Sequence, residues 1–333
     1  MNKIFLKILS LLALSCSALA HEGNWTAARP DGHAPISVMG DHMHKMGESM
    51  ISYRYMTMDM KGLLKGSSDI TKAQAAPSYP MSMMGNMLPK DMTMDMHMFG
   101  TMHAISDKLT LMGMINYLDN EMSMQSGMKM ESSGLSDIKL GGLYELLSTD
   151  HGRRAHLNLG VSLPTGSIDE KNSAGNILGY GMQLGSGTWD FTPAITFLGQ
   201  TDDYSWGAQF RGVLRIGEND QDYSLGNRLE ASLWGARKLT DSISASAKLD
   251  YSSQSEVDGE DSRMMKTMSS ALDPKSQGRD LATFGLGLNY YFQAGELRGH
   301  RFAAEWETPI SQNVNGVQLE LDSIWTIGWQ YAW

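Results

Sequence analysis

Residues 155–163, AHLNLGVSL, alternate strictly, with apolar residues at the odd positions and polar residues or glycine at the even ones. Because successive side chains of a β-strand point to opposite faces of the sheet, this stretch predicts a strand with one apolar and one polar face. In a soluble sandwich the apolar face would point inward, whereas in a membrane barrel it faces lipid and encloses a polar lumen. The alternation alone leaves both folds open.

Similar alternation recurs along the chain, and the lengths of the intervening connections distinguish the two folds. We expect strands over residues 49–60, 91–103, 109–118, 135–146, 154–164, 188–198, 205–216, 223–237, 242–252, 280–292, 300–309 and 322–333. The connections after the odd strands are mostly long (61–90, 119–134, 165–187, 253–279 and 310–321), and those after the even strands are short; only 217–222 departs from this trend. Long loops at one end and short turns at the other are typical of outer-membrane barrels, with both termini on the periplasmic side.

Aromatic residues and the last strand support the same fold. Near the expected periplasmic strand ends lie Tyr53, Tyr204, Trp206, Tyr290, Phe292, Trp329 and Tyr331, and near the outer ends lie Tyr117, Trp189, Trp306 and Trp325. Aromatic side chains favour the two levels where the membrane meets water. Trp333 ends an alternating strand, which resembles the C-terminal signal read by the barrel-assembly machinery, although phenylalanine is the usual last residue. We therefore predict an all-β fold, a closed antiparallel up-and-down transmembrane β-barrel of about 12 strands with short periplasmic turns and long extracellular loops.

The N-terminal residues indicate export. Lys3 and Lys7 precede the apolar residues 8–14, and Ala18-Leu19-Ala20 provides small residues at the positions that a signal peptidase reads, so we expect residues 1–20 to be a cleaved signal peptide. Cleavage would leave a mature chain that starts at His21 without cysteine, because Cys16 is the single cysteine. We expect a Met/His-rich N-terminal segment at 21–48 and an outer-membrane β-barrel at 49–333. Its expected location is the outer membrane of a Gram-negative bacterium, with membrane lipid as a partner.

Composition excludes other classes of protein. No later segment approaches the roughly 20 consecutive apolar residues that a membrane helix needs. The net charge is −10 and no basic patch is present, so we expect no nucleic-acid partner.

Methionine is concentrated in one part of the chain: 22 of the 27 methionines lie between Met39 and Met130, and several histidines lie there too. Thioether sulfur favours Cu(I), and imidazole binds copper in either oxidation state, so copper is the candidate cofactor or cargo. The candidate metal ligands are His42, Met43, His44, Met46, Met92, Met94, Met96, His97, Met98, Met112 and Met114. Met112 and Met114 should face the lumen, because Leu109, Leu111 and Ile115 of the same strand are expected to face lipid.

The sequence does not decide which side chains of residues 92–98 face the lumen and which face lipid. Met92, Met94, Met96 and Met98 share one face of a strand. If Thr93, Asp95 and His97 face the lumen, these methionines face lipid and are flexible apolar filler. If the frame is reversed, they form a stripe of thioethers inside the barrel.

Several motifs resemble one bacterial family. They are GHAPI at 32–36, VMGDHMH at 38–44, YRYM at 53–56, MTMDMHM at 92–98, LPTGSI at 163–168 and GWQY at 328–331. They resemble a family of outer-membrane transporters labelled "putative MetA-pathway of phenol degradation", in which LPTG at the top of a strand is typical and the Met/His motifs mark a narrower subgroup. The resemblance covers nearly the whole mature chain and implies an outer-membrane channel for small solutes, aromatic compounds among them. It supplies no functional residues to carry over.

Three functions follow from these observations. The first is a channel or transporter for small solutes, aromatic compounds or metal ions, with a lumen lined by Asp137, Lys139, Glu145, His156, Asp190, Arg211, Arg215, Arg228, Glu230, Lys248, Asp250, Arg301, Glu305 and Glu307. The same residues could instead form interior salt bridges, because twelve strands leave only a narrow interior. The second is a surface protein that captures or sequesters Cu(I). The third, a lipid hydrolase using His156, Asn158 and Ser162, lacks an acyl-transfer motif and spreads these residues too far along one strand, so we expect no enzyme.

Overall fold

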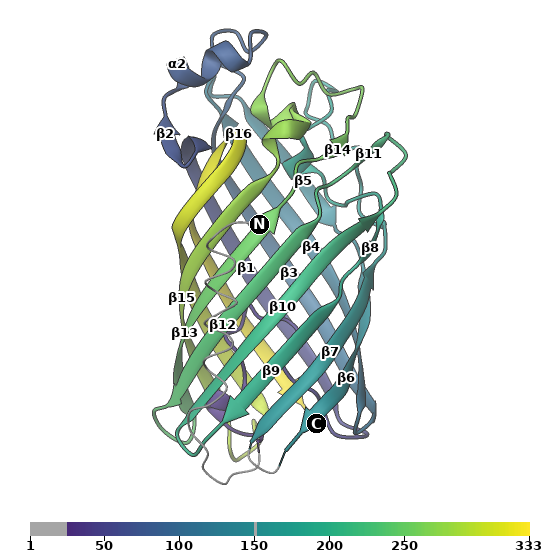
Figure 1. Cartoon of the computed structure of the whole chain (residues 1–333), viewed down its shortest axis with the longest axis vertical. Coiled ribbons are helices and arrows are strands. Elements are labelled where there is room, and N and C mark those ends of the chain that lie inside the picture. Colours follow the sequence, from purple (N-terminus) through teal and green to yellow (C-terminus); the bar gives the residue numbers. More distant parts are fainter. Residues whose placement is uncertain (1–24, 150–151) are drawn as a thin grey trace.

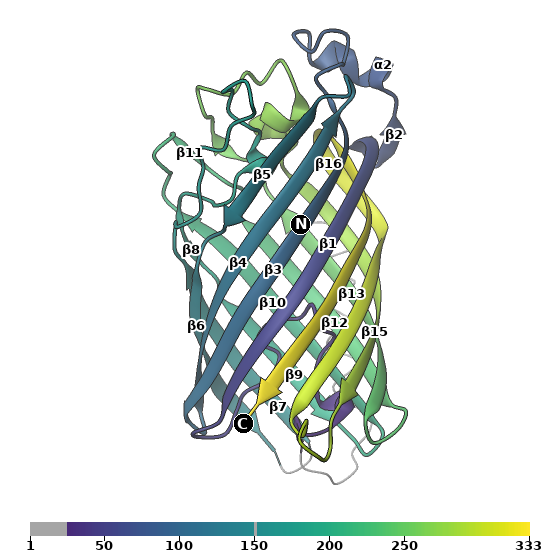
Figure 2. The same ribbon diagram turned by 180° about the vertical axis from the view of Figure 1, so that it is seen from behind.

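A computed structural model describes residues 25–149 and 152–333, so the expected signal peptide and His21 lie outside the described residues. The chain forms one tall barrel of tilted antiparallel strands (Figures 1 and 2). The ring follows chain order: β1 (Ser49–Gly66), β3 (Pro89–Ser106), β4 (Leu109–Met124), β6 (Lys139–Ser148), β7 (Arg153–Ser162), β8 (Trp189–Phe191) with β9 (Ala194–Gln200), β10 (Tyr204–Ile216), β12 (Arg228–Lys238), β13 (Ile243–Gln254), β15 (Arg279–Tyr291) and β16 (His300–Ala332).

Pairing between β16 and β1 closes the ring. The element β16 is a hairpin, because its residues up to Val314 pair with β15, those that follow pair with β1, and Gly299 lies against Ala332. The elements β8 and β9 both lie between β7 and β10 and form one strand interrupted at Pro193. In the described part of the chain twelve strands therefore surround the lumen, in agreement with the predicted number of about 12. Within the described residues, closure gives every strand of the ring a neighbour on both sides, which a sheet in lipid requires.

Long connections gather at the upper end of the barrel, and the connections at the lower end, beside the C-terminus, are short (Figure 2). The upper loops carry β2 (Ser68–Ile70), α2 (Lys72–Ala75), η3 (Ala76–Ser78), η4 (Tyr180–Met182), η5 (Ser270–Leu272) and η6 (Pro274–Ser276). Among the described residues no helix is long and apolar enough to cross a membrane.

Three expected connections are corrected by the structure. Residues 119–134 are not a loop, because β4 runs to Met124 and β5 (Lys129–Leu135) pairs back on it. Residues 310–321 are not a loop either, since both arms of the β16 hairpin continue through them with a turn at Gly316. Residues 223–227 do not belong to β12: β11 (Tyr223–Ser224) pairs with β14 (Asp258–Gly259) instead, so the upper connection 217–227 is long and the one exception to the length rule disappears.

The two faces of the strands have the expected frame. In β7 the side chain of Leu159 is 46% exposed on the outside, and Asn158 is 9% exposed on the inside. In β3 the frame that the sequence left open is settled, because Met92 and Met98 are buried and Phe99 is exposed. The methionines of residues 92–98 therefore face the lumen.

Candidate functional site

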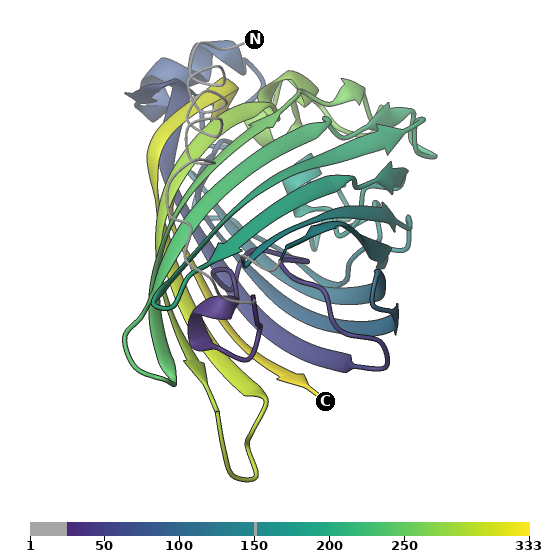
Figure 3. The same ribbon diagram turned by 60° about the horizontal axis from the view of Figure 1, so that its bottom comes forward.

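Residues 25–48, here called the plug, lie inside the ring of strands at its lower end (Figure 3). They contain one short helix, η2 (Pro30–Gly32), and no residue from Pro30 to His44 is exposed. A segment without regular pairing must satisfy its backbone groups elsewhere, and here the lumen wall supplies many of the partners.

Side chains of the wall hold the plug by its backbone. Arg301 Nη2 donates to the carbonyl oxygen of Ala34 at 2.6 Å, and Gln209 Nε2 donates to that of Met39 at 3.0 Å. His156 Nε2 and Asn158 Nδ2 both donate to the carbonyl oxygen of Gly40, at 2.9 and 3.0 Å. Glu305 accepts from the backbone N–H of Ser37 at 2.9 Å. These anchors come from strands around the ring, so the plug is fixed from several sides.

An apolar contact supports the same placement. Trp25, Ala34 and Val38 of the plug pack with Leu198 of β9 and Trp234 of β12 in one buried cluster. Leu198 and Trp234 are apolar side chains inside a largely polar lumen, and the plug removes them from water. This burial favours the docked plug.

The predicted lumen residues lie inside the barrel, where most pair with one another. Lys248 Nζ lies 2.8 Å from Asp250, 2.9 Å from Glu305 and 2.9 Å from Glu307. The remaining ion pairs join Arg211 and Arg228 to Glu230, Arg215 to Asp190, and Arg154 to Glu145. Asp137 accepts from the backbone N–H groups of Gly166 and Ser186, and Lys139 lies beside Arg211 in a cavity of about 250 Å³. Interior pairing, the alternative that the sequence left open, thus accounts for many of these residues.

A compact group of polar side chains lies within the plug itself. Ligand atoms of His33, Asp41 and His42 all come within 4.8 Å of one another. His42 Nδ1 lies 3.0 Å from Asp41 Oδ1, and the rings of His33 and His44 contact that of His42 edge-on, with centroids 4.6 and 4.9 Å away. Both ring nitrogens of His33 and the Nε2 atoms of His42 and His44 are buried without a hydrogen-bond partner in the described part of the chain.

The surroundings of His33 and His44 favour the neutral form of these two imidazoles. Burial, together with the positive charge of Arg301, holds the pKa of His33 well below its usual value. Burial lowers the pKa of His44 to about 3. Neutral imidazole is the form that binds metals.

Thirteen methionines line the lumen on three neighbouring strands, and we call them the methionine wall. They are Met50, Met56, Met58, Met60, Met92, Met94, Met96, Met98, Met102, Met112, Met114, Met122 and Met124. Many oppose one another directly across the sheet: Met58 faces Met94, Met56 faces Met96, Met60 faces Met92, and Met92 also faces Met122. Directly opposed side chains in an antiparallel pair lie about 4.5–5.5 Å apart at Cβ, so their sulfur atoms can reach a common ligand.

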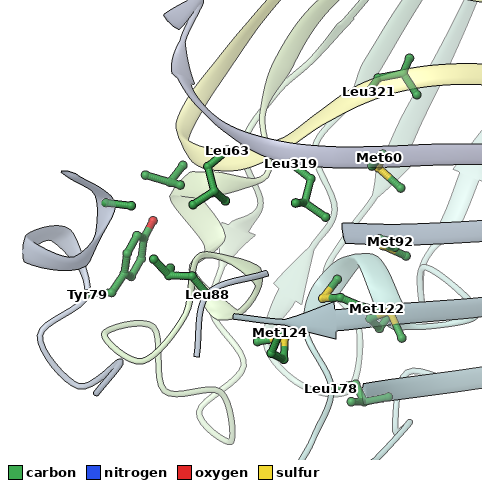
Figure 4. Packing of buried hydrophobic residues seen from close by; sticks show 13 residues of the cluster. Met60, Leu63, Tyr79, Leu88, Met92, Met122, Met124, Leu178, Leu319 and Leu321 are labelled. Atoms are coloured by element: carbon green, nitrogen blue, oxygen red, sulfur yellow. The ribbon is translucent and has the colours of Figure 1, made fainter. Parts of the chain in front are cut away.

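The wall connects the two ends of the lumen. At the upper end Met60, Met92, Met122 and Met124 pack beneath the loops with Leu88 and Leu321 (Figure 4). Together with Met60, Met92 and Met122 of this cluster, Met58 and Met94 line a cavity of about 300 Å³, which Arg228 and Arg279 also line. At the lower end Met50, Met102 and Met112 pack against Met43 of the plug. A second cavity there, of about 760 Å³, is lined by His33, His42, Met43 and His44.

The structure brings together some of the candidate metal ligands and separates others. Met92, Met94, Met96, Met98, Met112 and Met114 belong to the methionine wall, and Met43 adjoins it. His42 and His44 are buried in the plug, whereas Met46 is 70% exposed. His97 lies on the outer face, where its Nδ1 is 2.8 Å from the hydroxyl of Tyr53.

The sequence alone did not identify several residues of the plug and of the methionine wall. His33 and Asp41 join His42 only because the plug folds back on itself, which no local spacing reveals. Seven further methionines could have been found from parity, since all are even-numbered, like Met112 and Met114, and share the lumen face through cross-strand pairing: Met50, Met56, Met58, Met60, Met102, Met122 and Met124. Of the residues in the hydrolase alternative, His156 and Asn158 both bind the carbonyl of Gly40.

Comparison with known proteins places this geometry in context. The chain is similar to the solved COG4313 outer membrane channel from Pseudomonas putida F1, with a TM-score of 0.67 and 10% sequence identity over 90% of this chain and 100% of that one. A Pseudomonas aeruginosa FadL homologue aligns with a TM-score of 0.45 and 11% identity over 94% of this chain and 95% of that one. No curated protein matches the sequence. At these identities the first likeness shows the fold alone, which is that of an outer-membrane barrel.

The family follows from sequence. Residues 90–307 match the family described as "Putative MetA-pathway of phenol degradation". The match covers well over half of the chain and includes the strands from β3 into β16. The chain therefore belongs to this family of outer-membrane barrel proteins.

Proposed function

We propose that the protein is an outer-membrane channel for a soft monovalent metal ion, Cu(I), which moves along the methionine wall and meets the plug at the periplasmic end. The observation that carries this proposal is the side on which the methionines lie. Lipid-facing methionine would be filler, but thirteen methionines that face the lumen on adjacent strands place thioethers where a solute passes.

The chemistry of the wall suits this ion better than a hard one. Thioethers bind soft Cu(I) and are poor ligands for Mg²⁺ or Ca²⁺. Arg279 lines the same cavity as Met58 and Met94, and its positive charge opposes a general flow of cations. Selection would therefore come from ligation by sulfur, and opposed pairs such as Met58 and Met94 allow an ion to pass between neighbouring groups of ligands.

Flux into liposomes tests the proposal. The full chain is reconstituted into vesicles that contain a Cu(I)-specific dye, and Cu(I) is supplied outside on a weak ligand. We expect flux above that of empty vesicles, and a strong reduction when Met58, Met60, Met92 and Met94 are all replaced by leucine. Replacing Met81, Met83 and Met84, which are exposed in the upper loop, by leucine is the matched control and should leave flux unchanged.

The same vesicles distinguish the other solutes that the family resemblance suggests. Methionine also packs well against aromatic rings, so an aromatic compound is the competing cargo. Uptake of phenol that survives the four leucine substitutions, with no Cu(I) flux in the unmodified protein, would reject the metal and favour the aromatic compound.

A further inference from the structure

The histidines of the plug form a second potential site, separate from the methionine wall in its chemistry. His33, His42 and His44 are 6%, 1% and 7% exposed, and Asp41 is 4% exposed. Buried polar atoms in folded proteins almost always have a partner, and an unpaired one costs about 1–3 kcal/mol. Here five ring nitrogens of three neighbouring imidazoles are buried without a hydrogen bond in the described residues, and one of them, His42 Nδ1, lies 3.0 Å from Asp41.

The unpaired groups converge on one point, which a shared metal ion explains better than unrelated packing defects do. The ligand atoms of His33, Asp41 and His42 converge within 4.8 Å, and a tetrahedral ion with bonds of about 2.0–2.1 Å holds its ligand atoms about 3.3 Å apart. Small rotations of the side chains bridge that difference. The cavity of about 760 Å³ at the lower end reaches the same histidines and gives an ion a way in.

We propose that His33, Asp41 and His42, with His44 beside them, bind one divalent first-row transition-metal ion, and that Cu²⁺ is held more tightly than Zn²⁺. Imidazole and carboxylate ligands suit both ions, and the general order of affinities places Cu²⁺ above Zn²⁺. This site uses nitrogen and oxygen, whereas the proposed Cu(I) route uses sulfur, so neither proposal depends on the other.

Binding would fasten the plug. His33 lies on one side of the turn that contains Ser37, and Asp41 and His42 lie on the other, so one ion closes this loop and stabilises its docked form. Arg301 contacts Ala34, the neighbour of His33, and its positive charge opposes the ion. The site should therefore bind less tightly than the same ligands would without that charge.

Electron paramagnetic resonance of the purified full chain in detergent tests the assignment with Cu²⁺ as the probe. The parent protein for this test carries His21→Ala and should bind one Cu²⁺ with nitrogen couplings from at least two imidazoles. All variants carry His21→Ala, because a histidine at a free N-terminus would also bind copper. His33→Ala with His42→Ala should weaken binding by roughly tenfold or more.

The matched control replaces His97 and His103, which lie on the outer face, by alanine and should bind Cu²⁺ as tightly as the parent. Heat-dependent gel migration checks that each variant is folded. If the plug variant fails to fold, the coupling in the His21→Ala protein still decides: a spectrum with one imidazole or none overturns the proposal. Equal affinity in the plug and control variants also overturns it. Cu(I) flux into vesicles is measured separately, so the loss of this site and the loss of the methionine route give different results.

Discussion

Arg301 of β16 donates from Nη2 to the backbone carbonyl of Ala34, 2.6 Å away, and so ties the barrel wall to the plug. Its Nε and Nη2 also donate to Asn289 at 3.1 and 2.6 Å, and Nη1 donates to Gln330 at 2.5 Å. The planar guanidinium makes these contacts on several sides at once, which a lysine could not do. The neighbouring wall residues Asn289 and Gln330 thus hold the Arg301 side chain in the position where it binds the plug.

Replacing Arg301 by alanine should loosen the plug and raise single-channel conductance in planar bilayers. The carbonyl of Ala34 loses a charge-assisted hydrogen bond, and the wall loses the group that positions it. Arg298→Ala, in the lower turn between β15 and β16, provides the control and should conduct like the unmodified protein. Equal conductance in all three proteins would show that this anchor does not hold the plug.

The contact between the plug and Gly328 of the wall can be tested by adding one methyl group at that glycine. A Cβ added at Gly328 would lie 2.9 Å from Cγ1 of Ile36, a plug residue that is only 1% exposed. We expect Gly328→Ala to displace the plug and increase conductance, and Ile36→Ala to restore the closed state in the double variant. At Gly235 the nearest atom to an added Cβ is 4.0 Å away, so Gly235→Ala should change nothing. Failure of Ile36→Ala to rescue would argue against this contact.

Charges on the two faces of β7 should have different effects. Leu159→Arg, on the lipid face, should cost about 2–4 kcal/mol or block assembly. Asn158→Arg should still give a barrel that migrates differently before and after boiling, because this position faces the lumen. It should also release the plug, since Asn158 Nδ2 now donates to Gly40 and lies 2.7 Å from where a Cβ of that glycine would be. Similar folding defects in both variants would contradict the assignment of faces.

The buried cation Lys248 should matter for stability. It is 4% exposed and lies within 3 Å of three carboxylates. Lys248→Met leaves those charges facing one another, so unfolding in urea should become easier by about 3–5 kcal/mol. Adding Glu305→Gln and Glu307→Gln removes most of the repulsion and should recover much of the loss. An unchanged unfolding midpoint in Lys248→Met would mean that lumen water already screens these groups.

The strands could be predicted from sequence because alternate residues of each strand face lipid and the lumen, and therefore alternate between apolar and polar. Leu159 and Asn158 differ in polarity and lie on opposite faces, and that relation is local. Prediction failed where the barrel rises above the membrane. Residues 119–124 and 310–314 are strands but carry the exposed polar residues Asp119, Glu121, Ser311 and Asn313, because a strand in water has no lipid face to keep apolar.

The plug could not be predicted for a different reason. Its residues 30–44 have no strand or helix periodicity, and two of their main partners, Arg301 and Gln209, are more than 160 residues away. The sequence marked His42 and His44 by spacing but could not place them inside the barrel or join them to His33. The methionine wall could be predicted in part. The sequence shows its thioether ligands, but only the pairing of β3 with β1 and β4 shows that they face the lumen.

The most direct test of the proposed cargo is a crystal of the full protein soaked in Ag(I), a stable substitute for Cu(I), with anomalous scattering used to locate the metal. We predict peaks in the lumen between opposed methionines, in particular near Met58 and Met94 and near Met60, Met92 and Met122. Silver bound only at exposed methionines such as Met83 and Met84, with none along the lumen, would contradict the claim that the methionine wall is a path for a soft metal ion.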